Sequence, residues 1–211
     1  IISFSGVDSA GKSTHIELVR SKLTKNGKQV VVIWARGGYT PGFSFLKKIL
    51  RLVFKRKLAE AGPSKLRELQ LKRPLVSKIW LNLAILDLIL FWGLIPRWHS
   101  LMGKDIIFDR YIFDTNIDFK INFPNFDFSS YWLYLILKII AVKPDVMFML
   151  LVNIKESLIR SKNKKEPFPD SLVVTKLRRK LYLENFKNNR DFCLIDCNKS
   201  LNICKKEIFK F

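Results

Sequence analysis

The sequence predicts an α/β fold: a five-stranded parallel sheet with helices on both faces. Two observations support this prediction. Short apolar runs recur along the chain and alternate with segments of helical periodicity. Between the first two runs there is room for a single helix, and such a strand–helix–strand unit makes its two strands parallel. The apolar runs lie at residues 1–5, 29–35, 104–109, 146–152 and 192–196.

The length and composition suit one globular domain spanning residues 1–211. The chain has a mass of 24.7 kDa and 48% hydrophobic residues, enough to bury a sizeable core. Its cysteines, Cys193, Cys197 and Cys204, have no histidine near them in the sequence, so they follow neither a disulfide framework nor a zinc pattern. With no visible signal peptide, we expect a reducing, cytoplasmic location. His15 and His99 lack an evident catalytic companion and are predicted to be structural.

A glycine-rich loop follows the first predicted strand. Residues 6–14, GVDSAGKST, match the pattern G-x-x-x-x-G-K-[ST] in full, and residues 13–23 have helical character. The glycines allow backbone N–H groups to point inward around an anion, and the helix N-terminus adds partial positive charge. Strand, loop and helix together are the context in which this pattern binds a nucleoside triphosphate.

The side chains of this loop have distinct predicted roles. Lys12 can reach the outer phosphates, and the Ser13 hydroxyl can bind Mg²⁺. The residues expected to contact phosphate are Gly6, Ser9, Ala10, Gly11, Lys12, Ser13 and Thr14.

The region after the second predicted strand allows two interpretations. Arg36 lies where open α/β sheets bind ligands, so it is either a phosphate contact or a solvated loop arginine. Residues 43–58 form an amphipathic helical pattern with a basic face. Such a helix can rest on an anionic membrane, but we favour packing against the core. Ser64 is a candidate cap for a further short helix.

Residues 75–95 are the most apolar stretch of the chain. Asn82 and Asp87 interrupt it, and Gly93 and Pro96 are expected to end it. We therefore favour a helix buried in the domain or at a dimer interface over a membrane span. If Asp87 is buried there, it needs a partner or a ligand.

The third predicted strand ends in Asp109-Arg110-Tyr111. A carboxylate at a strand tip beside the glycine loop can hold Mg²⁺ through water, and the arginine can bind an acceptor phosphate. Four polar residues follow on a predicted loop or short helix that lines the same cleft: Asp114, Thr115, Asn116 and Asp118.

The last third of the sequence continues the alternation. Helices are expected at residues 131–142, at 171–188 and from about residue 200. Residues 160–172 combine the cations Arg160, Lys162, Lys164 and Lys165 with two prolines. This composition is typical of a basic lid that closes over phosphates, although an exposed basic loop is the alternative.

The formal net charge of +20 also has two interpretations. The first is a polyanionic partner, either nucleic acid or an acidic membrane surface. The second is a lysine-rich composition with solvated charges, which we favour because no dedicated nucleic-acid motif gathers the charge. Weak peripheral contact with anionic membrane stays open.

These motifs resemble the thymidylate kinase family of P-loop nucleoside monophosphate kinases. Residues 4–14 are similar to the family's F-x-G-x-[DE]-x-x-G-K-[ST]-T pattern, and residues 109–111 match its DR[YH] signature. Residues 143–160 resemble the family's run from a Pro-Asp pair through a strand and helix to a lid arginine. The resemblance covers nearly the whole chain. It implies a three-layer P-loop NTPase fold, ATP and Mg²⁺ as cofactors, and a homodimer.

The resemblance also implies roles for single residues. Asp8 would orient the acceptor phosphate and its metal, and Asp109 would organise the metal. Lys12 and Ser13 would hold the donor phosphates and Mg²⁺. Some members carry an arginine inside the loop, where this chain has Ser9. Members without it draw positive charge from a basic lid, which here would be supplied by Arg160, Lys164 and Lys165.

The base pocket departs from the family pattern. Asp87 lies where a thymine-contacting arginine is expected, and Phe119 replaces an expected glutamine. A site without these hydrogen-bonding partners loses discrimination for thymine, so a kinase is better supported than dTMP as its acceptor. The expected acceptor contacts are Asp8, Arg36, Asp87, Arg110, Tyr111 and Phe119.

The expected reaction is Mg²⁺-dependent transfer of the γ-phosphoryl group of ATP to a nucleoside monophosphate, with dTMP as the default. One alternative is a related kinase for a nucleoside, or for a sugar or lipid-linked phosphate. Another is a non-catalytic nucleotide-binding protein that docks on membrane or nucleic acid.

Overall fold

The computed structural model describes residues 1–54, 73–124, 126–128, 130–164, 170–188 and 191–211. Where the sequence predicts one domain, the structure divides the chain into two compact units. Unit 1 comprises Ile1–Trp34, Arg97–Phe126 and Lys143–Phe211, and unit 2 comprises Ala35–Pro96 and Asp127–Val142. Unit 2 is thus built from two separate stretches of chain that interrupt unit 1.

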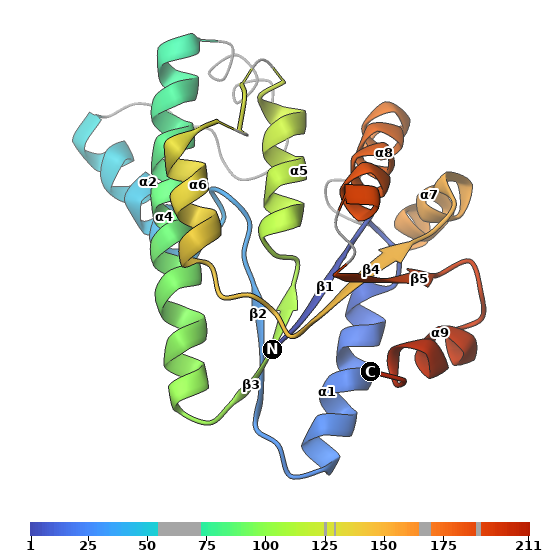
Figure 1. Ribbon diagram of the computed structural model, residues 1–211. Coiled ribbons are helices and arrows are strands. Elements are labelled where there is room, and N and C mark those ends of the chain that lie inside the picture. The colour runs from blue at the N-terminus through green and yellow to red at the C-terminus, as the bar shows by residue number, and fades with distance from the viewer. Residues whose placement is uncertain (55–72, 125, 129, 165–169, 189–190) are drawn as a thin grey trace. The chain divides into compact units, whose positions relative to one another are not determined.

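Unit 1 contains a five-stranded, all-parallel sheet with the strand order β2-β3-β1-β4-β5 (Figure 1). The strands are β1 (Ile2–Gly6), β2 (Val30–Trp34), β3 (Asp105–Asp109), β4 (Val146–Leu151) and β5 (Phe192–Asp196). The predicted α/β class and all five strands are confirmed. Strand β1 lies at the centre, paired with β3 on one side and β4 on the other, so the glycine-rich loop leaves the middle of the sheet.

The helices of unit 1 pack on this sheet. They are α1 (Lys12–Lys25), α5 (Ile112–Asn122), α7 (Ile154–Asn163), α8 (Leu172–Asn188) and α9 (Leu201–Ile208). Helix α1 contacts β1, β2 and β3, α5 contacts β1 and α8, and α9 contacts β5. The core between these elements includes Phe4 and Phe148, whose rings stack with centroids 5.1 Å apart. A continuous apolar core of this kind explains why β4 has an uninterrupted apolar sequence.

Unit 2 contains α2 (Pro41–Phe54), most of α4 (Pro74–Leu101) and α6 (Trp132–Ile140). The polar residues in the apolar sequence of α4 both have partners: the Tyr131 hydroxyl donates to Asn82, and the Thr40 hydroxyl donates to Asp87. The expected partner of Asp87 is therefore confirmed. The end of the predicted basic helix, residues 55–58, lies outside the described residues. The same holds for Ser64 and the short helix that it was expected to cap, since residues 55–72 are not described.

Helix α4 does not end at Gly93 or Pro96, so this prediction was wrong. Pro96 is buried inside the helix and removes one backbone hydrogen bond, a cost of about 3 kcal/mol that packing can outweigh. The helix ends instead at Leu101, two residues before Gly103, which has a φ of 72°. The N–H of Lys104 donates to the carbonyl of His99 at 3.1 Å, the bond that characterises a glycine-terminated helix end.

Among the described residues, α4 alone is long and apolar enough to cross a membrane. Its most apolar 18-residue window has a mean hydropathy of 1.9, and 39% of that window is buried in the structure. This criterion uses length and composition alone, and the core helix of a soluble protein also meets it. The preference for a packed helix over a membrane span therefore stays a prediction.

Candidate active site

A cavity of about 500 Å³ lies in unit 1, within the size range of small-molecule sites. Residues 8–14 of the glycine-rich loop form one part of its wall, and Asp109 and Arg110 form another. Arg160 and Lys164 contribute from the end of α7. The loop, the end of β3 and the start of the predicted lid are therefore brought together.

The glycine-rich loop has the backbone context that its pattern requires, because β1 ends at Gly6 and α1 begins at Lys12. Gly6 has a φ of 145°, and a Cβ atom placed there would lie 2.1 Å from the carbonyl oxygen of Leu150. Gly11 precedes α1 with a φ of 92°, in the left-handed region that favours glycine. Both glycines are thus required by backbone geometry.

Lys12 is buried and lies against its own loop. Its Nζ atom donates to the carbonyl oxygens of Gly6 at 2.9 Å and Val7 at 2.8 Å. Burial, followed by repulsion from Arg110, lowers the pKa of Lys12 to about 8, while Asp8 acts in the opposite direction. An anion that enters the cavity would therefore stabilise the charged form of the Lys12 amine.

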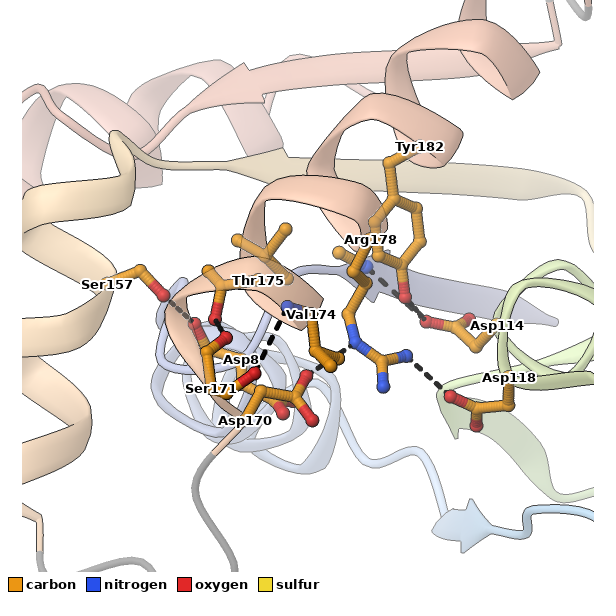
Figure 2. Close-up of polar contacts among 12 residues, drawn as sticks. Asp8, Asp114, Asp118, Ser157, Asp170, Ser171, Val174, Thr175, Arg178 and Tyr182 are labelled. Atoms are coloured by element: carbon orange, nitrogen blue, oxygen red, sulfur yellow. Dashed lines mark hydrogen bonds and ion pairs between the residues drawn. The ribbon is translucent and has the colours of Figure 1, made fainter. Parts of the chain in front are cut away.

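Arg110 and Asp8 form an ion pair that joins the end of β3 to the loop. Burial alone would lower the pKa of Arg110, but Asp8 and neighbouring acids raise it above its ordinary value. Arg110 has a φ of 72°, and its N–H donates to the carbonyl of Phe4 at 2.9 Å. Ser157 of α7 holds the loop from another direction, since its hydroxyl donates to the Asp8 carbonyl at 2.8 Å (Figure 2).

Asp109 and Ser13 provide oxygen atoms in the same cavity. A carboxylate and a hydroxyl are ligands that a hard cation such as Mg²⁺ accepts, so these residues fit the predicted metal. Burial raises the pKa of Asp109, and the positive charges of Lys12 and Arg110 partly offset this effect.

The acidic residues after Arg110 do not line the cavity, contrary to prediction. Helix α5 begins at Ile112, directly after the strand end, which turns Asp114 and Thr115 into the interior. Asp114 accepts hydrogen bonds from the Ser5 hydroxyl at 2.6 Å and from the Tyr182 hydroxyl (Figure 2). It thereby fixes α5 to β1 and α8 beneath the loop. Asn116 and Asp118, on the same helix, are also absent from the cavity wall.

Arg178 of α8 is a structural residue that the sequence analysis missed. Its side chain is 5% exposed and donates to Asp170 at 2.7 Å and to Asp118 of α5 (Figure 2). This places Asp170, in the predicted lid, against α8. Arg178 stands among other lysines and arginines in the sequence, so nothing there distinguishes it.

Only part of the predicted lid is described. Arg160 lies in the last turn of α7, where it pairs with Glu156 at 2.7 Å and donates to the Cys197 carbonyl at 3.3 Å. Lys164 follows the helix. Lys165 and the rest of residues 165–169 lie outside the described residues.

The predicted acceptor contacts fall into three groups. Asp8 and Arg110 line the cavity, whereas Arg36 and Asp87 belong to unit 2. Two further residues are buried in unit 1 away from the cavity wall. Tyr111 stacks on Phe108 with centroids 4.3 Å apart, and Phe119 packs edge-on against Phe123. The roles of Arg36, Asp87, Tyr111 and Phe119 in binding an acceptor stay predictions.

No protein-family model matches this sequence, and no curated protein matches it significantly. The family resemblance therefore depends on the motifs given above.

Proposed function

We propose that this chain is a P-loop kinase that uses Mg²⁺ and ATP to phosphorylate a nucleoside monophosphate, with dTMP as the default acceptor. One observation carries the proposal. The Arg110–Asp8 pair lies in the same cavity as Lys12 and the loop amides. The positive charge of Arg110, which directly follows β3, is therefore added to that of Lys12. Phosphoryl transfer needs such an arrangement of positive charge more than it needs covalent chemistry.

In the proposed reaction the loop amides and Lys12 bind the β- and γ-phosphates of ATP. Lys12 exchanges its two carbonyl contacts for phosphate oxygens, which are stronger acceptors because they are charged. Ser13 and Asp109 would hold Mg²⁺, which neutralises phosphate charge. Arg110 would bind the acceptor phosphate, with Asp8 fixing the guanidinium orientation.

Arg160 and Lys164 are proposed to stabilise the transferring group from the lid side. Because Ser9 supplies no charge inside the loop, these cations would carry the positive charge that some P-loop kinases place there. The Arg160–Glu156 pair leaves the guanidinium partly exposed, so it is available to a ligand that enters the cavity. The family resemblance further leads us to propose a cytoplasmic homodimer.

The proposal is tested by measuring ADP release with a panel of acceptors: nucleoside monophosphates, nucleosides, and sugar and lipid-linked phosphates. We expect turnover with a nucleoside monophosphate in the presence of Mg²⁺ and its loss on addition of a chelator. Turnover only with another acceptor class would replace the substrate assignment. If no acceptor supports ADP release while nucleotide still binds, the kinase proposal is wrong.

A further inference from the structure

Three residues with metal-binding side chains meet in the wall of the cavity. They are His15 in the first turn of α1, Cys197 directly after β5, and Cys204 on α9. Their potential ligand atoms all lie within 4.8 Å of one another, and all three residues are at least 96% buried, with exposures of 3%, 3% and 1%. The cysteines have no histidine near them in the sequence, yet the fold brings His15 beside two of them.

The side chains of this cluster have few other partners. The Nδ1 atom of His15 is buried without a hydrogen-bond partner, which is costly for a polar atom. The Cys204 sulfur makes long contacts, 3.4 Å to the Asp196 carbonyl and 3.8 Å to that of Lys199, and it also hydrogen-bonds with the other cysteine of the cluster, Cys197. The nearest carbonyl contact of the Cys197 sulfur is 3.8 Å, to Ile195. These contacts leave both sulfurs available as ligands.

We propose that His15, Cys197 and Cys204 bind a thiophilic divalent metal ion of the Zn²⁺ class, with a fourth position open to the cavity. Two thiolates and one imidazole suit Zn²⁺ and favour it over Mg²⁺ or Ca²⁺, which prefer oxygen. A tetrahedral zinc ion with these ligands needs separations of about 3.5–3.8 Å between ligand atoms. Small side-chain rotations would therefore complete the site.

The charges agree with this assignment. Binding would replace one proton on each thiol, so that Zn²⁺, two thiolates and a neutral imidazole carry no net charge. The nearby cations Arg160 and Lys199 would then oppose the metal only weakly. Burial lowers the pKa of His15, which keeps the imidazole in the neutral form that a metal requires. Burial raises the pKa of Cys197 to about 12 and also raises that of Cys204, so both thiols keep their protons until the metal binds.

Such a site would connect two parts of unit 1 that chain topology alone leaves separate. His15 immediately follows the glycine-rich loop, and the cysteines flank the turn between β5 and α9. A metal bound only by the folded chain stabilises it by mass action. The inference is independent of the proposed kinase activity.

The test uses the full chain, kept reduced with a phosphine, freed of metal by chelation and titrated with Co²⁺ as the probe. We expect a thiolate-to-cobalt charge-transfer band, the strong visible bands of tetrahedral Co²⁺, saturation at one ion per chain, and displacement by Zn²⁺. Zn²⁺ should also release about two protons per chain in weak buffer and raise the Tm. Cys204→Ser and His15→Gln should weaken Co²⁺ binding at least about tenfold, the lower range for altered metal sites.

Cys193→Ser is the matched control, since Cys193 lies on β5 outside the cluster and the variant should keep the wild-type spectrum. A second measurement needs no variant: Zn²⁺ should slow the alkylation of Cys197 and Cys204, which these buried thiols undergo only when the chain opens, and should leave that of the less buried Cys193 unchanged. Absence of the thiolate band in the reduced wild-type chain would overturn the proposal. So would a band that keeps its wild-type intensity and affinity in Cys204→Ser, or alkylation rates of Cys197 and Cys204 that Zn²⁺ leaves unchanged. None of these readouts requires nucleotide, so they stand apart from the kinase assay.

Discussion

Arg110 and Asp8 are 102 residues apart in the chain, yet the guanidinium of Arg110 donates to the Asp8 carboxylate. The pair is mostly buried, with side-chain exposures of 8% and 22%. It joins the two short sequence patterns on which the proposed function depends. The Asp109-Arg110-Tyr111 pattern alone is weak, but the pair brings its arginine and the glycine-rich loop into the wall of one cavity.

Substitution of Arg110 tests its proposed contact with the acceptor. In Arg110→Ala we expect kcat/KM for the acceptor to fall on the order of 10²-fold, because a preorganised cation is lost. The KM for ATP should change little. The unfolding free energy should also fall by about 3 kcal/mol, since Asp8 loses its buried partner. Arg20→Ala, at an exposed arginine of α1, is the control. Equal losses for ATP and acceptor would contradict the assignment.

Lys12 provides the most direct test of catalysis. Lys12→Ala should abolish measurable phosphoryl transfer, because the ammonium group that reaches the outer phosphates is removed. Circular dichroism should show a folded protein, and Lys25→Ala, at an exposed position in the last turn of α1, should retain activity. Wild-type turnover in Lys12→Ala would show that the loop does not act on phosphate.

The Arg178 network should contribute to stability more than any surface ion pair. Arg178→Ala removes the buried guanidinium that pairs with the buried Asp118 carboxylate, and we expect a loss of about 3–5 kcal/mol in unfolding free energy by denaturant titration. Lys180→Ala, which breaks an exposed pair with Glu184, should cost less than about 1 kcal/mol. Similar losses in the two variants would show that the Arg178 contacts do not stabilise the fold.

Asp87 should make stability depend on pH. Burial raises the pKa of Asp87 above 3.8, and the hydrogen bonds from Thr40 and Phe43 offset this only partly. The folded chain therefore holds this proton more tightly than the unfolded chain. The contribution is fully present below pH 3.8 and is lost as the pH rises through the raised pKa. Asp87→Asn should remove that decline from the pH dependence of the unfolding free energy. If the unfolding free energy of the variant and of the wild type varied with pH in parallel, this role of Asp87 would be refuted.

The strands and the glycine-rich loop could be predicted because their information is local. A strand is indicated by the β-branched run at residues 29–35 alone, and a glycine-rich loop by the contiguous motif at residues 6–14 alone. The end of α4 could not be predicted, because burial of Pro96 inside the helix outweighed the tendency of proline to end helices. The helix ends only just before Gly103, which has a positive φ.

The contacts missed from the sequence are those that the sheet topology creates. Asp114 of α5 meets Tyr182 of α8, and His15 of α1 meets Cys204 of α9, only because these helices are brought around one sheet. No spacing along the chain encodes such meetings.

The close approach of Gly6 to Leu150 affects how future variants should be interpreted. Glycine at this position is needed for two neighbouring strands to stay at bonding distance, whether or not the loop ever meets an anion. A methyl group there would act as a wedge in the middle of the sheet. Loss of activity in a Gly6 variant would therefore reflect disruption of the sheet. Only substitutions that leave the backbone unchanged can test the chemistry of the loop.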